Sequence, residues 1–157
     1  MGERSITMPN RQPTTPDKQT LAKELRRKYL ELGPGPHEPF KKCGTAYATT
    51  VLTPINRTPC KNWSGVGPRD FPTVEKIGGD AIVAEMKERD GCWHCHLRCG
   101  GHLKAKAGRN NVSHKPEYET IAAFGPMCLN DDLESIIQAS DIVNAYGLDS
   151  PALSDGR

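Results

Sequence analysis

The sequence contains little of the material that builds a large hydrophobic core. Of its 157 residues, 36% are hydrophobic and 6% are aromatic, and the mean hydropathy is −0.62. A chain of this length is expected to form one domain, and a bound cofactor would help to stabilise so modest a core. The 15 glycines and 13 prolines predict long irregular segments between the helices.

Long apolar runs are also missing, so no stretch is expected to cross a membrane. Residues 1–16 are polar and rich in Pro and Thr, without the hydrophobic core of a secretory signal, and are predicted to be flexible. Residues 17–157 are predicted to form a single helical domain. The expected compartment is the cytoplasm, where thiols stay reduced. The six cysteines are therefore interpreted as metal ligands or buried residues rather than disulfides.

The net charge is only +2, which gives no reason to expect a nucleic-acid or membrane partner. Its distribution is uneven, however. Residues 90–115 carry five basic and one acidic side chain, whereas residues 116–157 carry one basic and eight acidic. Positive charge around thiols favours thiolates and can stabilise an anionic metal cluster. Two oppositely charged solvated faces are the alternative interpretation.

Apolar residues recur at helical spacing in four parts of the chain. Gly78 and Gly79 interrupt the second of these helices and leave a firmer part from Asp80. The predicted helices cover residues 17–32, 73–89, 117–124 and 131–146. The fourth is expected to bury Leu133, Ile136, Ile137, Val143 and Tyr146.

The ends of the fourth helix are well marked in the sequence. Asp131 and Asp132 stand at its N-terminal end, where carboxylates are favoured, and Gly147 is a suitable C-terminal cap. Residues 45–53, TAYATTVLT, are interpreted as a short strand, and residues 54–72 as a loop. The predicted fold class is therefore mainly α with much irregular chain.

The most informative stretch is GCWHCHLRCGGH, residues 91–102. Its cysteines have C-x2-C-x3-C spacing, so three thiolates can surround one metal centre. Zinc takes four ligands, and an iron–sulfur cluster also takes four, often with one far away in sequence. CWHCH also matches the haem c attachment pattern, which a cytoplasmic location disfavours. The cysteines are Cys92, Cys95 and Cys99, and the candidate fourth zinc ligands are His94, His96, His102 and Cys128.

The remaining cysteines carry a weaker signal. Cys43 and Cys60 stand alone in the irregular region and are expected to be buried small residues. For Cys128 we expect a core position, although it would reach the cysteine segment if the third helix folded back. Spacing alone leaves zinc, an iron–sulfur cluster and a site without metal all open.

Three segments in register resemble the tungsten-containing aldehyde ferredoxin oxidoreductase family. GCWHCHLRCG (91–100) resembles its cluster segment, and KPEYETIAAFG (115–125) resembles its P-E-Y-E-T helix. DDLESIIQASDIVNAYGLD (131–149) resembles a helix that runs into a D-x-x-G-L-D pterin motif. Residues 43–90 are similar less specifically, so the resemblance covers roughly residues 40–149.

The resemblance implies an oxidoreductase in which tungsten on two molybdopterin-type dithiolenes converts aldehydes to carboxylic acids. Electrons leave through a 4Fe-4S cluster to ferredoxin. One glutamate near the metal would activate water or take a proton, and Glu117 is slightly favoured over Glu119 for this role. The implied cluster ligands are Cys92, Cys95 and Cys99. The implied pterin-binding residues are Asn144, Gly147, Leu148 and Asp149.

The chain also departs from the family. Position 144 is Asn where the motif has Asp, so one pterin contact is altered. The family's large N-terminal domain, fourth cluster cysteine, second D-x-x-G-L motif and catalytic histidine have no counterpart here. The chain thus resembles an internal piece of the C-terminal helical half, from a truncated gene, a split gene or an incomplete sequence.

The expected function is that of a fragment or subunit which contributes cluster ligands and part of one pterin site, and which is inactive alone. Its expected partners are ferredoxin and the missing enzyme segments, or a partner chain that supplies the fourth cluster ligand. The alternatives are a stand-alone iron–sulfur electron-transfer module and a zinc-binding interaction module.

Overall fold

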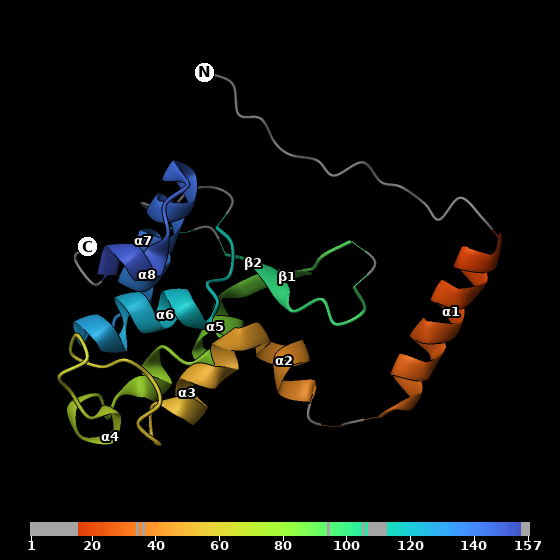
Figure 1. Cartoon of the computed structure of the whole chain (residues 1–157). Helices are drawn as coiled ribbons and strands as arrows, with labels where there is room; N and C mark the ends of the chain where they lie inside the picture. Colours follow the sequence, from red (N-terminus) through yellow and green to blue (C-terminus); the bar gives the residue numbers. More distant parts are fainter. Residues whose placement is uncertain are drawn as a thin grey trace.

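The computed structural model describes residues 16–33, 35, 37–93, 95–104, 106 and 113–154. The predicted flexible segment falls almost entirely outside these residues. The described part is mainly α-helical, as predicted, and none of its helices has both the length and the apolar character of a membrane span. Figure 1 shows the helices α1 (Pro16–Glu31), α2 (Glu38–Cys43), α3 (Ala48–Leu52), α4 (Gly67–Asp70), α5 (Gly79–Glu85), α6 (Tyr118–Phe124), α7 (Leu133–Tyr146) and α8 (Ser150–Ser154). Three 3-10 turns and two strands complete the described elements: η1 (Gly44–Tyr47), η2 (Val74–Lys76), η3 (Pro126–Cys128), β1 (Met86–Asp90) and β2 (Gly100–Leu103).

The core lies where α5, α6 and α7 meet. Each of these helices directs an apolar face into it, and Ile77, between η2 and α5, completes its set of isoleucines. Phe71 and Cys60 join it from the irregular segment before α5. Its fully buried isoleucines are Ile77, Ile82, Ile121, Ile136 and Ile137.

Three of the four predicted helices are confirmed as α1, α6 and α7, within a residue or two at each end. Asp132 caps α7, because its carboxylate accepts a hydrogen bond from the Glu134 backbone N–H at 3.1 Å. Gly147 ends α7 in the left-handed region, at φ +66°. Tyr146 does not face the core as predicted, since it is 77% exposed at the last position of the helix.

The strand predicted for residues 45–53 is wrong, because this stretch forms η1 and α3. The fully buried side chains there are Ala46, Thr49 and Thr53, which recur at three- and four-residue intervals. That spacing is typical of one helix face and not of a strand. Tertiary packing of small residues therefore overrides the preference of threonine and valine for strands.

The helix predicted for residues 73–89 is shorter than expected. The helix is interrupted at its two glycines as predicted: η2 ends at Lys76, Gly78 is the N-cap of α5, and Gly79 is its first residue. The chain then leaves the helix at Met86 and becomes β1, which pairs antiparallel with β2. The sequence gives little sign of this strand, because four of its five residues are exposed and nearly all are charged.

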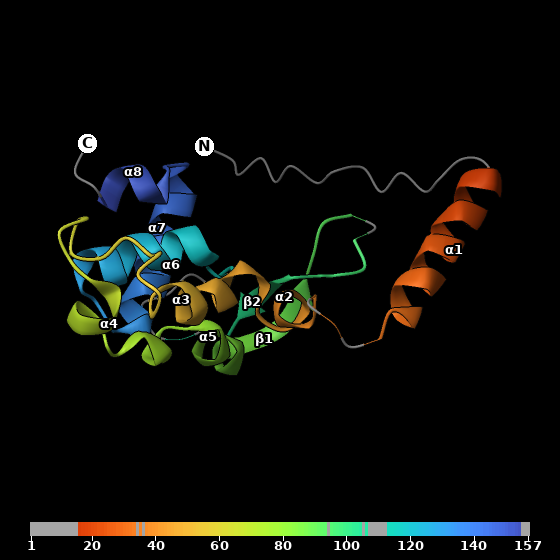
Figure 2. The ribbon, with the colours of Figure 1, turned by 60° about the horizontal axis from the view of Figure 1, so that its bottom comes forward.

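α1 lies apart from the core in both views (Figures 1 and 2). Leu21 and Leu25 of its apolar stripe are more than half exposed. Its C-terminal end reaches the cysteine segment, where the Tyr29 and His96 rings lie 6.2 Å apart between centroids.

Candidate functional site

The cysteine segment forms the loop that joins β1 to β2. The two strands hold its ends together, because Asp90 pairs with Gly100 in the hairpin. Within the loop the Cys95 backbone N–H donates to the Cys92 carbonyl at 3.0 Å, which places the first two thiols on one turn. The exposed Arg98 guanidinium donates to the Arg89 carbonyl at 3.1 Å and so links the end of the loop to β1.

The donor set of this loop suits a thiolate-bound metal centre. Cys92 is exposed, Cys95 and Cys99 are half-buried, and all three are free thiols. Soft thiolates on a short loop suit either an iron–sulfur cluster or zinc. The three sequence-predicted ligands therefore lie together on one hairpin loop.

The predicted fourth-ligand candidates fare differently. Cys128 is exposed, contrary to the expected core position, and its thiol donates to the Ala123 carbonyl at 3.2 Å at the C-terminal end of α6. In Figures 1 and 2 that end of α6 points away from the hairpin loop. His96 is exposed, and His94 lies outside the described residues. His102 lies in β2 and contacts Asp90 and His114. Cys43 and Cys60 are buried, as predicted.

Glu117 precedes α6 and is held by contacts from two directions. Its Oε2 accepts from the Thr45 backbone N–H at 2.8 Å and from the Thr45 hydroxyl at 2.6 Å. The same hydroxyl accepts from the Tyr118 N–H at 2.9 Å. The other oxygen, Oε1, lies 2.5 Å from the Lys115 ammonium, which also donates to the Cys43 carbonyl at 3.0 Å.

Gly44 joins this carboxylate to the cysteine loop. It has φ +66°, and a Cβ built on it would lie 2.7 Å from the Cys99 carbonyl oxygen and 2.8 Å from Glu117 Oε2. It would also lie 2.5 Å from the Lys115 Nζ. Only a residue without a side chain allows the loop and the glutamate to approach each other this closely.

Glu119, the other candidate in the E-Y-E segment, is exposed on α6. The structure thus brings Glu117, and not Glu119, next to the backbone of the cysteine loop. Sequence reasoning missed Lys115, Thr45 and Gly44 as parts of this site. Lys115 stands two residues before Glu117, but only the fold shows that its side chain is buried, at 1% exposure.

The residues of the predicted pterin motif lie together around the C-terminal end of α7. Asn144, Gly147, Leu148 and Asp149 are all exposed. The Leu148 N–H donates to the Val143 carbonyl at 2.9 Å, which fixes the turn after the helix.

α6 links this motif to the glutamate. The hydroxyls of Thr120 and Ser150 lie 3.0 Å apart, so α6 contacts the chain directly after Asp149. Glu117 stands three residues before Thr120, and Asp149 stands directly before Ser150.

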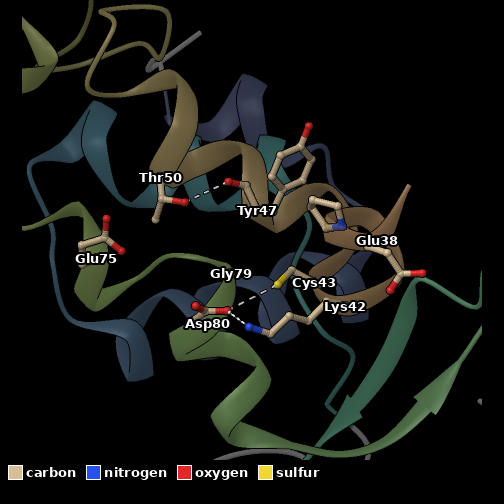
Figure 3. Close-up of a pocket in the computed structure, with 9 residues that line it drawn as sticks. Glu38, Lys42, Cys43, Tyr47, Thr50, Glu75, Gly79 and Asp80 are labelled. Atoms are coloured by element: carbon tan, nitrogen blue, oxygen red, sulfur yellow. Dashed lines mark hydrogen bonds and ion pairs between the residues drawn. The ribbon is translucent and has the colours of Figure 1, made fainter. Parts of the chain in front are cut away.

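A pocket of about 370 Å³ lies between α2, η1 and α5 on another side of Cys43 (Figure 3). Lys42 pairs with Asp80 at 2.7 Å, and the Cys43 thiol lies 3.7 Å from the same carboxylate. The hydrogen bond from Lys42 lowers the pKa of Asp80, whereas burial and then the nearby Asp80 charge raise the pKa of Cys43. Burial and a raised pKa are consistent with the predicted role of Cys43 as a buried small residue.

Comparison with known proteins shows the family to which the chain is related. Residues 20–154 match the family model described as aldehyde ferredoxin oxidoreductase, domains 2 and 3. The tungsten-containing aldehyde ferredoxin oxidoreductase of Thermococcus kodakarensis is 30% identical over 138 residues, which is 85% of this chain and 22% of the relative. The proteins of that description from Pyrococcus furiosus and Pyrococcus horikoshii are 29% and 30% identical over 85% and 71% of this chain.

The chain spans about a fifth of the length of these curated relatives. The matched region contains the cysteine loop, the Glu117 cluster and the turn after α7. The chain therefore belongs to the aldehyde ferredoxin oxidoreductase family, in the region described as domains 2 and 3.

Proposed function

We propose that this chain is a fragment or subunit of a tungsten–pterin oxidoreductase that converts aldehydes to carboxylic acids and passes electrons to ferredoxin. In this role Cys92, Cys95 and Cys99 hold a 4Fe-4S cluster, and Asn144, Gly147, Leu148 and Asp149 form part of one pterin site. The remaining cluster ligand and the rest of the pterin site come from other enzyme segments or from a partner chain.

One observation supports this assignment above the others. The Cys99 carbonyl oxygen and the Glu117 carboxylate both approach within 2.8 Å of the Cβ position that Gly44 leaves empty. A cluster loop packed against a hydrogen-bonded glutamate brings an electron carrier close to a proton acceptor. Oxidation of an aldehyde needs both, because R-CHO and water become R-COOH, two electrons and two protons.

The bound cofactors supply the two-electron oxidation and the one-electron transfers onward. Glu117 is suited to take a proton, since its carboxylate is 38% exposed and so remains accessible. Lys115 and Thr45 hold its two oxygens in one orientation. A base held in place before the reaction contributes more than one that must first be ordered.

Complementation tests this function. The chain is combined anaerobically with the flanking segments of the Thermococcus kodakarensis relative, and aldehyde-dependent reduction of ferredoxin is measured. Activity is expected with both parts and with neither part alone. A complex that forms, carries its cofactors and still fails to oxidise any aldehyde would contradict the proposal.

A further inference from the structure

A second group of possible metal ligands lies at the base of the cysteine loop. None of its residues is among the proposed cluster ligands. Asp90, His102 and His114 each offer one ligand atom, and these atoms lie within 4.8 Å of one another. Two imidazoles and one carboxylate form a different donor set from the thiols of the loop. They suit a divalent first-row transition metal such as zinc.

Backbone pairing positions the two histidines. The segment from Ser113 to Lys115 lies beside β2, because Leu103 N–H donates to the Ser113 carbonyl at 2.9 Å and Lys115 N–H donates to the Gly101 carbonyl at 2.8 Å. His102 and His114 are direct partners in this antiparallel bridge. Their ring centroids lie 4.7 Å apart. Directly opposed residues on neighbouring strands direct their side chains to the same face.

Asp90 approaches His102 from the other neighbouring strand. In the register of the hairpin Glu88 faces His102 and Asp90 faces Gly100, so Asp90 and His102 are diagonal neighbours. The Asp90 Oδ2 lies 3.5 Å from the His102 Nε2. The central β2 thus carries His102 between a carboxylate on one side and an imidazole on the other.

The distances fit one ion after small side-chain rotations. Ligand atoms about 2.0–2.2 Å from zinc in a tetrahedral site lie roughly 3.3–3.5 Å from one another. The Asp90–His102 pair already has that spacing. The Nε2 of His102 is the nitrogen that faces Asp90, and its Nδ1 is buried without a hydrogen-bond partner among the described residues, so no contact of Nδ1 opposes a small rotation of the ring toward the ion.

We propose that Asp90, His102 and His114 bind one zinc ion or a similar divalent transition metal, separate from the metal centre of the cysteines. The ion would join β1, β2 and the Ser113–Lys115 segment directly at both ends of the cysteine loop. With three protein ligands, water would take the fourth zinc position, and the ion would hold together the hairpin that carries the thiols and the segment that leads to Glu117.

The test counts metals in the full chain after anaerobic cluster reconstitution, addition of zinc and gel filtration. About one zinc per chain is expected in addition to the iron. His102→Asn and His114→Asn should lose the zinc and keep their iron and sulfide. Asp90→Asn should weaken zinc binding at least about tenfold, and the exposed His96→Asn serves as the matched control that retains both metals.

Cobalt provides a readout on the unchanged protein, so the test does not depend on how the variants fold. In the difference spectrum of cobalt-loaded minus zinc-loaded protein, which removes the absorption of the cluster, cobalt bound by imidazole and carboxylate shows d–d absorption without the sulfur-to-cobalt charge-transfer bands of a thiolate site. Such a spectrum supports the proposal. Zinc that survives both histidine substitutions, a thiolate-type cobalt spectrum that disappears in Cys95→Ser, or no stoichiometric zinc would each overturn it.

Discussion

The ammonium group of Lys115 lies 2.5 Å from the carboxylate of Glu117, and the lysine side chain is 1% exposed whereas that of the glutamate is 38% exposed. A buried cation thus holds one oxygen of a carboxylate whose other oxygen accepts hydrogen bonds from Thr45, while part of the glutamate side chain stays accessible to solvent. The charge of Lys115 is compensated by Glu117 and by the Cys43 carbonyl. This arrangement orients the acid without removing it from solvent.

Replacing Lys115 by Met should lower the free energy of unfolding by about 1–3 kcal/mol, because it leaves the Cys43 carbonyl and Glu117 without their partner. The loss is smaller than for a fully buried ion pair, since solvent screens the half-exposed glutamate. Denaturant unfolding measures it, with the exposed Lys23→Met as control. Equal stability of the two variants would show that the buried contact contributes nothing.

Alanine substitutions at two glycines with the same φ angle distinguish the cost of backbone strain from the cost of steric crowding by neighbouring atoms. Gly44 and Gly147 both have φ +66°, but a Cβ at Gly147 meets nothing within 4 Å, whereas one at Gly44 meets three atoms closer than 3.0 Å. Gly147→Ala should cost about 1–2 kcal/mol of unfolding free energy through backbone strain alone.

Gly44→Ala should cost clearly more than Gly147→Ala and should lower the iron content of the reconstituted protein, because it pushes the Cys99 backbone away from Glu117. Thermal unfolding together with iron analysis compares the two variants. Similar losses of stability with unchanged iron would mean that the loop and the glutamate are not packed as described.

In the complemented enzyme, Glu117→Gln should reduce kcat for aldehyde oxidation about 10²–10⁴-fold, the range for loss of a positioned general base. Glu119→Gln should have the smaller effect, since Glu119 is exposed on α6. Steady-state kinetics decides between them. The reverse order would transfer the proposed role to Glu119.

Protonation of Asp70 should lower the stability of the folded chain at acid pH. Hydrogen bonds from the Arg69 guanidinium and then the Val66 N–H lower its pKa from 3.8 to about 2. Because the pKa is lowered in the folded state, the stabilisation is complete above about pH 4 and is lost as the pH falls toward 2.

Asp70→Asn should therefore flatten the dependence of the unfolding midpoint on pH between about pH 4 and 2. The loss should be small because the Arg69–Asp70 ion pair is at the surface. Asp17→Asn, in the first turn of α1, is the matched control. If the unfolding midpoint of Asp70→Asn fell between pH 4 and 2 as steeply as that of the unchanged protein, the Val66 and Arg69 contacts would not hold the carboxylate in solution.

The sequence predicted best those elements whose signals are local. α6 and α7 combine helical periodicity with recognisable ends, and the cap at Asp132 and the left-handed Gly147 appear where those residue types indicate them. The cysteine spacing likewise predicted three candidate ligands close to one another, and all three lie on the short loop between β1 and β2.

The parts that sequence reasoning missed depend on contacts between distant segments. β1 has no apolar alternation, and its pairing with β2 becomes visible only when the hairpin is formed. His102 and His114 are twelve positions apart, and their bridge places them side by side. Cys128 is exposed because η3 turns it outward after the core residue Met127.

Iron and acid-labile sulfide analysis of the anaerobically purified chain tests the central claim most directly, with Cys95→Ser as the ligand variant and Cys128→Ser as the control. We predict iron and sulfide in equal amounts, lost in Cys95→Ser and retained in Cys128→Ser. Zinc without sulfide on Cys92, Cys95 and Cys99 would contradict it.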